Sequence, residues 1–292
     1  MDLNRVSHEK ESEKEDWDII IKPQTGILEI NLIELWRYRD LLMMFVKRDI
    51  VTFYKQTILG PLWFFIQPLF TTIMFMIVFG GLAGISTNGL PQGLFYMAGI
   101  LCWNYFSDCL NRTSTTFKEN QQIFGKVYFP RVVVPLSIIV SNLIRFGIQF
   151  ILFIAFYIYY LTQGISIHPN SGILLFPILI LIIAGLALGF GMIITALTTK
   201  YKDLTFLVQF GVQLWMYATP IIYPLSATPE KYRWLIVANP MTAVVETFKY
   251  GFLNQQPFEI NHLLYSLGFM IVILSIGVLF FNKVEKGFMD TI

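Results

Sequence analysis

The stretch Glu34–Leu69, ELWRYRDLLMMFVKRDIVTFYKQTILGPLWFFIQPL, decides the fold. Its first part mixes Lys and Arg with apolar residues that recur every three or four positions, a spacing that places them on one face of a helix: Leu42, Phe45, Val46, Ile50 and Phe53. Four charges between Lys47 and Lys55 favour a helix in the membrane interface over one that crosses the bilayer. After Gly60-Pro61 the sequence becomes uncharged and apolar. The stretch therefore predicts an interface helix at 31–57, a break, and a helix that enters the bilayer.

The composition of the whole chain also indicates a membrane protein. The 292 residues are 55% hydrophobic and 14% charged, with a mean hydropathy of +0.60. A soluble domain is typically about 25% charged. Several uncharged runs are about 20 residues long, which is enough to cross a hydrocarbon core of about 30 Å. The alternating runs of roughly ten residues that build a β-barrel are absent from the sequence. We expect an all-α polytopic membrane protein.

The polar and apolar segments predict two parts. Residues 1–25 are rich in Glu and Asp and cannot bury enough apolar surface to order themselves, so we expect a flexible acidic cytoplasmic tail. Residues 26–292 then form a single transmembrane domain. After the interface helix, six spans are expected at 62–84, 93–110, 132–161, 173–198, 204–222 and 263–281.

The distribution of Lys and Arg predicts the orientation. These residues gather in the segments that face the cytoplasm if the N-terminus lies there, while the short outer loops at 85–92 and 162–172 hold none. By the positive-inside rule, both termini are cytoplasmic. The long outer segment 223–260 holds apolar runs that are too short to cross, separated by Asn239-Pro240. We expect two short helices that dip back into the outer leaflet within 223–258, and a small amphipathic cap on the outer surface is the alternative.

Signals for catalysis or metal binding are scarce. The three histidines have no metal-ligand spacing, the apolar runs contain no carboxylate pair, and a GxxxxGK[ST] loop is absent from the sequence. Asp108, near the inner end of a predicted span, is expected to be solvated or to pair with Arg112 one turn later. Arg145 lies within another span, where it either contacts a substrate or extends its side chain to the inner interface. Without a buried acidic relay for ion coupling, we expect a transport chain rather than an enzyme, driven by a separate partner.

Two further features leave alternatives open. The polar sequence NRTSTTFKENQQIFGKVYFPR at 111–131 lies between two predicted spans on the cytoplasmic side, and it forms either a loop or a short helix that a motor subunit pushes. Aromatic residues make up 16% of the chain, and many lie in or beside the first, second and fifth spans. Each of them alone fits a membrane belt or core packing. Together they also fit a charge-poor conduit for a glycan, because sugar rings stack on aromatic faces.

Several motifs follow one another in a fixed order. The first group comprises ELWRYRDLL at 34–42, Arg48-Asp49, YKQT at 54–57, LGPLW at 59–63 and Pro68-Leu69. KVYFPR follows at 126–131, TPIIYP at 219–224, and Asn239-Pro240 closes the series. Together they resemble the ABC-2 type transporter permeases, most closely the branch that exports lipopolysaccharide O-antigen and teichoic acid polysaccharides. The likeness covers about residues 17–285, although Thr219 stands where many relatives have Ser.

The resemblance implies an assembly and a set of functional residues. It implies a permease homodimer in a bacterial inner membrane, with an undecaprenyl-linked polysaccharide as substrate and no nucleic acid. Each copy pairs with a separate ABC-type nucleotide-binding subunit that holds ATP and Mg, so this chain carries no cofactor itself. The ATPase-coupling residues would lie on the interface helix and on a coupling helix at 114–126: Arg37, Arg39, Arg48, Phe117, Lys118, Glu119, Gln122 and Lys126.

The resemblance also assigns residues to a channel and a gate. A glycan channel between the two copies would be lined by Trp63, Phe64, Tyr96, Trp103, Trp215, Tyr217 and Tyr223. The short helices at 223–258 would form an outer gate that includes Pro220, Pro224, Asn239 and Pro240. Arg145 matches no family motif, so its role as a substrate contact rests on its depth alone. Two alternatives stay open: an ABC-2 exporter of a small drug or lipid, and an ATPase-independent flippase of lipid-linked sugars.

Overall fold

The computed structural model describes residues 32–55, 59–165, 167–201, 203–254 and 259–287. The predicted acidic tail at 1–25 lies outside the described residues. In the part that is described, every regular element is helical, as the composition predicts. In chain order the elements are α1 (Leu32–Arg37), α2 (Arg39–Tyr54), η1 (Gly60–Leu62), α3 (Trp63–Phe75), η2 (Met76–Leu82), α4 (Gln92–Thr113), α5 (Thr116–Glu119), α6 (Gln121–Phe124), α7 (Val133–Thr162), η3 (Ser171–Leu175), α8 (Phe176–Lys200), α9 (Leu204–Tyr217), η4 (Leu225–Ala227), α10 (Glu230–Ala238), α11 (Pro240–Leu253) and α12 (Ile260–Gly287).

Four helical segments are long and apolar enough to cross a membrane. They are Gly60–Leu82, Val133–Thr162, Ser171–Lys200 and Ile260–Glu285, which coincide with four of the six predicted spans. At the predicted second span, α4 has 22 residues, but its polar side chains make it less apolar than the others. At the predicted fifth span, α9 has only 14 residues, because Pro220 follows soon after and cannot continue a helix. Length and composition therefore establish a helical membrane protein with four candidate spans.

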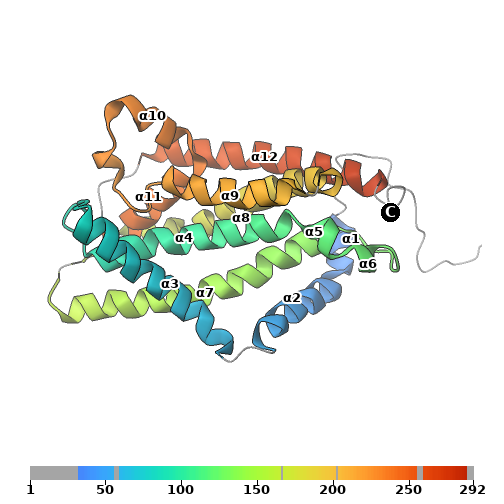
Figure 1. Ribbon diagram of the computed structural model, residues 1–292, viewed down its shortest axis with the longest axis horizontal. Coiled ribbons are helices and arrows are strands. Elements are labelled where there is room, and N and C mark those ends of the chain that lie inside the picture. The colour runs from blue at the N-terminus through green and yellow to red at the C-terminus, as the bar shows by residue number, and fades with distance from the viewer. Residues whose placement is uncertain (1–31, 56–58, 166, 202, 255–258, 288–292) are drawn as a thin grey trace, which may run out of the picture.

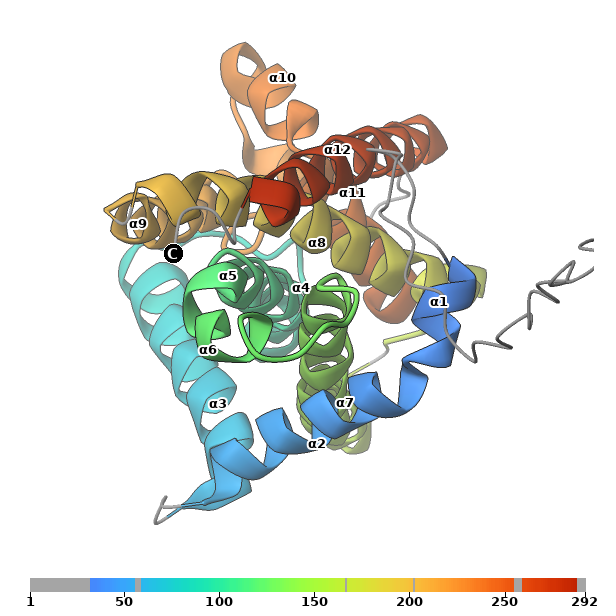
Figure 2. The same cartoon turned by 90° about the vertical axis from the view of Figure 1, so that its right-hand side faces the viewer.

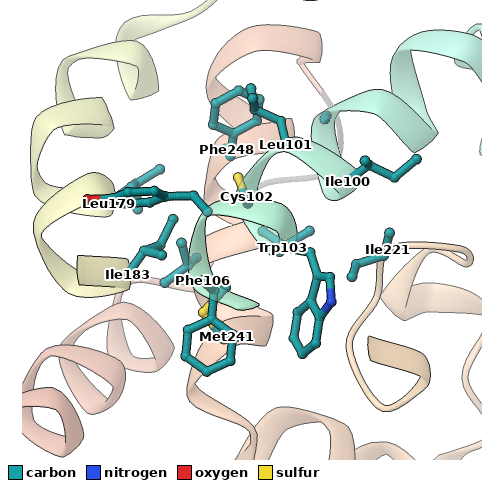
Figure 3. Close-up of a cluster of buried hydrophobic side chains, with 14 of the residues drawn as sticks. Ile100, Leu101, Cys102, Trp103, Phe106, Leu179, Ile183, Ile221, Met241 and Phe248 are labelled. Carbon is teal, nitrogen blue, oxygen red and sulfur yellow. The ribbon is translucent and has the colours of Figure 1, made fainter. Parts of the chain in front are cut away.

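The core of the molecule is built around α4. Figure 1 shows α4, α7, α8, α9 and α12 running side by side along the long axis. Almost every side chain between Gly93 and Leu110 on α4 is buried, against residues of α7, α8 and α11. Figure 3 shows part of this cluster, with Phe106 of α4 beside Ile183 of α8 and Met241 of α11. The polar residues of α4 that remain in this stretch, Asn104, Ser107 and Asp108, are the half-buried exceptions.

Glycines let α8 and α12 approach closely. A Cβ atom added at Gly277 of α12 would lie only 2.5 Å from the backbone oxygen of Gly189. One added at Gly189 would lie 2.8 Å from the backbone nitrogen of Leu274. Close backbone contact through small residues is a common way for helices to associate in membranes, where the hydrophobic effect between helices is weak.

The interface helix lies across one end of the bundle. The predicted helix at 31–57 is divided at Tyr38 into α1 and α2, and residues 56–58 lie outside the description. Figure 2 looks onto the end that carries α1, α5 and α6, and it shows α2 crossing that end of α7 before α3 begins. Phe45 and Val46 on the predicted apolar face are buried, and the ring of Phe45 lies 5.7 Å from that of Phe129. The side chain of Phe53 lies outside the description.

Candidate functional site

A buried carboxylate joins the interface helix to two other elements. Asp49 of α2, only 5% exposed, accepts hydrogen bonds from Arg48 at one oxygen (2.9 Å) and from Arg112 of α4 at the other (2.8 Å). Arg48 also donates to the side-chain oxygen of Asn120, between α5 and α6, at 3.3 Å. We call these four residues the Asp49 cluster. Charge-assisted bonds of this kind are roughly twice as strong as neutral ones, so α2, α4 and the short helices are held together as one unit.

The short helices α5 and α6 are anchored in the bundle by an aromatic side chain. Phe117 is fully buried, stacks on Phe281 of α12 at 4.7 Å and lies 5.8 Å from Phe124. The hydroxyl of Thr198 in α8 donates to the carbonyl of Ser114 at 2.8 Å. The predicted coupling helix at 114–126 is therefore two single helical turns, which begin at Thr116 and end before Gly125, rather than one continuous helix.

The other predicted coupling residues lie on the surface of the same end. Arg37, Arg39, Lys118, Glu119, Gln122 and Lys126 are exposed, and Arg48 is exposed in part while it belongs to the Asp49 cluster. The hydroxyl of Thr115 donates to Glu119 at 2.7 Å, which orients that carboxylate. The guanidinium of Arg39 lies 5.6 Å from the ring of Trp36, a side chain that is itself exposed. This end presents a polar, mainly basic face on a well-anchored support.

The loop after the short helices is fixed to the end of α12. Arg131, the last residue of KVYFPR, donates to the backbone oxygen of Glu285 at 2.8 Å, and its guanidinium lies 5.5 Å from the ring of Phe124. Burial lowers the pKa of Arg131, while the nearby carboxylate of Glu285 raises it. The motif therefore connects the α5–α6 region to α12.

At the opposite end, the predicted gate motifs contact one another. The side-chain oxygen of Asn239 accepts from the backbone N–H of Met241 at 3.0 Å and caps α11, with Pro240 at the first helical position. The amide nitrogen of Asn239 donates to the carbonyl of Ala218 (3.0 Å) and to the hydroxyl of Thr219 (2.8 Å). The two motifs TPIIYP and Asn239-Pro240, 20 residues apart in the sequence, are thus one structural unit.

The remaining gate residues bound this unit. Pro220 is buried in the segment that follows α9, and Pro224 precedes the short helix η4. The hydroxyl of Tyr265 in α12 donates to the carbonyl of Ala238 at 2.9 Å, and that of Ser266 donates to the carbonyl of Pro240 at 2.8 Å. In Figure 1, α10 projects beyond the bundle while α11 lies within it.

The predicted channel aromatics divide into two groups. Phe64, Tyr96 and Trp103 are buried within this single copy. Trp215 is half-buried, and its ring lies 5.2 Å from those of Phe106 and Phe190. Trp63 and Tyr217 are each 50% exposed, and the half-buried Tyr223 donates from its hydroxyl to the carbonyl of Tyr217. The rings of Phe64, Tyr96 and Trp103 are therefore enclosed in the protein, whereas those of the other four residues are at least partly exposed at its surface.

Arg145 forms an ion pair within the bundle. Its guanidinium lies 3.1 Å from the carboxylate of Asp108 on α4 and 4.8 Å from the ring of Phe64 on α3. The predicted pairing of Asp108 with Arg112 is wrong, because Arg112 turns toward Asp49. Arg145 lies well within α7 and Asp108 lies near the end of α4, and each charge reduces the desolvation cost of the other. Among the described residues, no group of three or more His, Cys, Asp and Glu side chains could hold a metal ion.

Sequence reasoning missed three members of the Asp49 cluster and one buried cation. Asp49, Arg112 and Asn120 are brought together only by the packing of α2 across the bundle, although the adjacent pair Arg48-Asp49 on an apolar helix was a signal. The sequence also suggested no buried Lys, yet Lys249 is fully buried on α11. Its position in the apolar run 241–253 was the available signal.

Comparison with known proteins identifies relatives along most of the chain. The profile of a family described as ABC-2 type transporter matches residues 40–253. An O-antigen export system permease protein of Myxococcus xanthus is 28% identical over 89% of this chain and 98% of its own length. One of Klebsiella pneumoniae is 29% identical over 86% and 94%. A polysialic acid transport protein of Escherichia coli is 22% identical over 84% of this chain and 93% of its own length.

Proposed function

The chain belongs to the ABC-2 type transporter family, and on this premise we propose that it is the permease subunit of an ATP-driven polysaccharide exporter. Its substrate would be a lipid-linked, O-antigen-like polysaccharide, carried on undecaprenyl across the bacterial inner membrane. ATP and Mg would be bound by a separate nucleotide-binding subunit. The observation that carries this choice is the end-to-end similarity to polysaccharide export permeases, which favours a glycan over a small drug or lipid.

We assign the coupling to the end that carries the Asp49 cluster. Two copies of the nucleotide-binding subunit would dock on the exposed faces of α1, α2, α5 and α6, and closing on ATP they would push against these helices. The buried contacts of Phe117 with α12 and of Asp49 with α4 support this role. Because they connect the surface helices directly to the bundle, a displacement of these helices would move α4 and α12 as well. Both termini would be cytoplasmic.

The same proposal completes six spans and places the channel. α4 and α9 would be the second and fifth spans, since burial in the bundle compensates for the polar residues of α4, and residues 218–222 would complete the short span of α9. Only 17% of the most apolar window of Gly60–Leu82 is buried in one copy, against 44% for Ser171–Lys200. The exposed faces of α3 and α9 would meet a second copy in a homodimer, and the polysaccharide would pass between the copies, along Trp63, Tyr217 and Tyr223.

The outer gate would be formed by α10, α11 and the segment after α9. Asn239 and Pro240 would act with Pro220 and Pro224, and the contacts of Asn239 with Ala218 and Thr219 support this grouping. A contact of Arg145 with the substrate stays a prediction, and Asp108 already neutralises its charge.

Deletion of the gene in its own host tests the proposal. Loss of surface polysaccharide with accumulation of the lipid-linked polymer inside the cell is the expected phenotype, and the intact chain should restore export. Normal surface polysaccharide with lost efflux of a small drug would instead support the drug exporter. Export that persists after deletion of the neighbouring ATPase gene would support the flippase.

Cross-linking tests the docking surface. Glu119→Cys lies on the exposed face and should form an adduct with the co-expressed ATPase during turnover. A cysteine at the exposed position Trp234 on α10, at the other end of the bundle, should form none and is the matched control. Equal adducts at both positions, or none at position 119, would contradict the assignment.

A further inference from the structure

Lys249 is a fully buried cation that the functions assigned above do not use. It lies on α11, and its Nζ atom donates to the carbonyl oxygen of Pro220 at 2.6 Å. The ammonium also lies 3.6 Å from the centre of the Phe95 ring on α4 and 3.9 Å from the carboxylate of Glu246 on its own helix. Together with Asp49, it is one of the two buried charged side chains among the described residues.

A buried cation is unusual enough to require a reason. Its desolvation penalty is large, and replacing such groups with apolar residues of similar size is often neutral or stabilising. Ionisable residues inside membrane proteins are rare and are usually linked to function. Stability therefore does not explain Lys249, whereas its partner suggests a role.

That partner belongs to the segment that leaves α9. Residues 218–222 follow the end of the helix at Tyr217, and the carbonyl of Pro220 therefore lies beyond the hydrogen-bond series of α9. Asn239 binds the start of this segment, at Ala218 and Thr219. Lys249, ten residues further along, binds it at Pro220. These two residues of α11, about 15 Å apart along its axis, thus bind neighbouring residues of the segment.

The opposite side of the segment fits closely against α4. A Cβ atom added at Gly99 would lie 2.8 Å from Cγ2 and 3.0 Å from Cα of Ile221. Figure 3 shows Ile221 beside Trp103 and Ile100 of α4. Residues 218–222 are therefore a wedge between α4 and α11, and α11 cannot separate from the wedge without breaking the bond from Lys249.

We propose that Lys249 is a positioning residue that holds the outer gate closed, by joining α11 to Pro220 and to the Phe95 face of α4. The proposal deepens the proposed export function and rests on it. Opening of the gate separates the Lys249 ammonium from the Pro220 carbonyl, and closure restores the contact. No bond or proton transfer is involved; the ammonium acts through its hydrogen bond and its attraction to the aromatic ring.

We call the contacts of Lys249 with Pro220 and Phe95 the latch. The rate at which a thiol in residues 218–222 reacts with a water-soluble reagent tests the latch and requires no transport. Ile222→Cys places a thiol at a buried position beside the latch, and the full chain in lipid nanodiscs meets a water-soluble maleimide on both faces. The parent chain, whose Cys102 and Cys109 are buried, gives the background. Adding Lys249→Met, which keeps the length and volume, should speed labelling by at least about tenfold, the factor expected from one charge-assisted hydrogen bond.

Two further variants test whether faster labelling reflects a general loss of packing around α11 and not the loss of the contact from Lys249. Thr242→Val, added to Ile222→Cys, removes another buried bond of α11, to the carbonyl of Ile236, and should leave labelling at the rate of Ile222→Cys alone. Lys249→Arg keeps a cation and should label slowly. Equal labelling with and without Lys249→Met, fast labelling in Thr242→Val, or equally fast labelling in Lys249→Arg would each overturn the latch. Export of polysaccharide, measured separately in cells, decides the proposed function: its absence in the parent chain would contradict that function, whatever the labelling shows.

Discussion

Replacing Asp49 with Asn is expected to release α2 from the bundle. The carboxylate accepts bonds from Arg48 at one oxygen and from Arg112 at the other, whereas an amide offers a single acceptor. Whichever way the amide turns, one arginine faces an NH2 group. One charge-assisted hydrogen bond is then lost, and two guanidinium groups remain close together without an anion between them.

The magnitude follows from the strength of that bond and from exposure. A hydrogen bond to a charged group contributes about 1.5–3 kcal/mol. The side chains of Arg48 and Arg112 are 41% and 28% exposed, so water screens much of their remaining repulsion. We expect a total loss of about 2–3 kcal/mol, which is roughly a 30- to 160-fold shift in the equilibrium between docked and released α2.

Hydrogen exchange measures this equilibrium directly, because local opening controls exchange of backbone amides. Amides of α2 should exchange roughly 30- to 160-fold faster in Asp49→Asn, while those of α8 keep the parent rate. Asp40→Asn is the matched control: the same substitution on the same helix, at a side chain that is 87% exposed and 3.9 Å from Arg39. It should change exchange less than about threefold. Equal protection of α2 in both variants would refute the role assigned to the Asp49 cluster.

Three further predictions concern packing, the buried ion pair and the channel. Gly277→Ala should lower the stability in detergent by about 1–3 kcal/mol, because the added methyl group overpacks against α8, and the unfolding temperature should fall. Gly268→Ala on the same helix should leave the unfolding temperature unchanged, because a Cβ atom there meets nothing within 4 Å. In a double-mutant cycle, the double variant Asp108→Asn/Arg145→Gln should lose about 1 kcal/mol less stability than the sum of the losses in the two single variants. Losses that simply add would contradict the ion pair. Tyr217→Ala, at a side chain that is 50% exposed, should unfold within about 0.5 kcal/mol of the parent yet export less polysaccharide, and unchanged flux and chain length would refute its place in the channel.

The fold was predictable where a segment is uniformly apolar or clearly amphipathic. The spans that correspond to α7, α8 and α12 agree with the helices to within a few residues, because their composition alone specifies a helix in lipid. The interface helix was predictable from its apolar spacing and its charges. Its division at Tyr38 was not, since no Pro or Gly marks that break.

The contacts of the sites were harder to predict, because they join residues far apart in the sequence. Asp49 meets Arg112 across 63 positions, and Asp108 was assigned to the nearest arginine along its own helix instead of to Arg145 on α7. The sequence suggested no buried Lys, because only the packing of α11 against α4 buries Lys249. Local spacing specifies which face of a helix a residue occupies, but tertiary packing decides its partner.

Transport in reconstituted vesicles tests the central claim most directly. The chain and its nucleotide-binding partner would be placed in vesicles with a fluorescent undecaprenyl-linked polysaccharide. A glycosidase outside the vesicles would then report the fraction of the glycan that it can cleave, and the change in this fraction with time measures movement across the membrane. We predict movement that requires ATP, Mg and a hydrolysis-competent partner. Movement that continues without ATP, or ATP hydrolysis that never moves the glycolipid, would contradict the account.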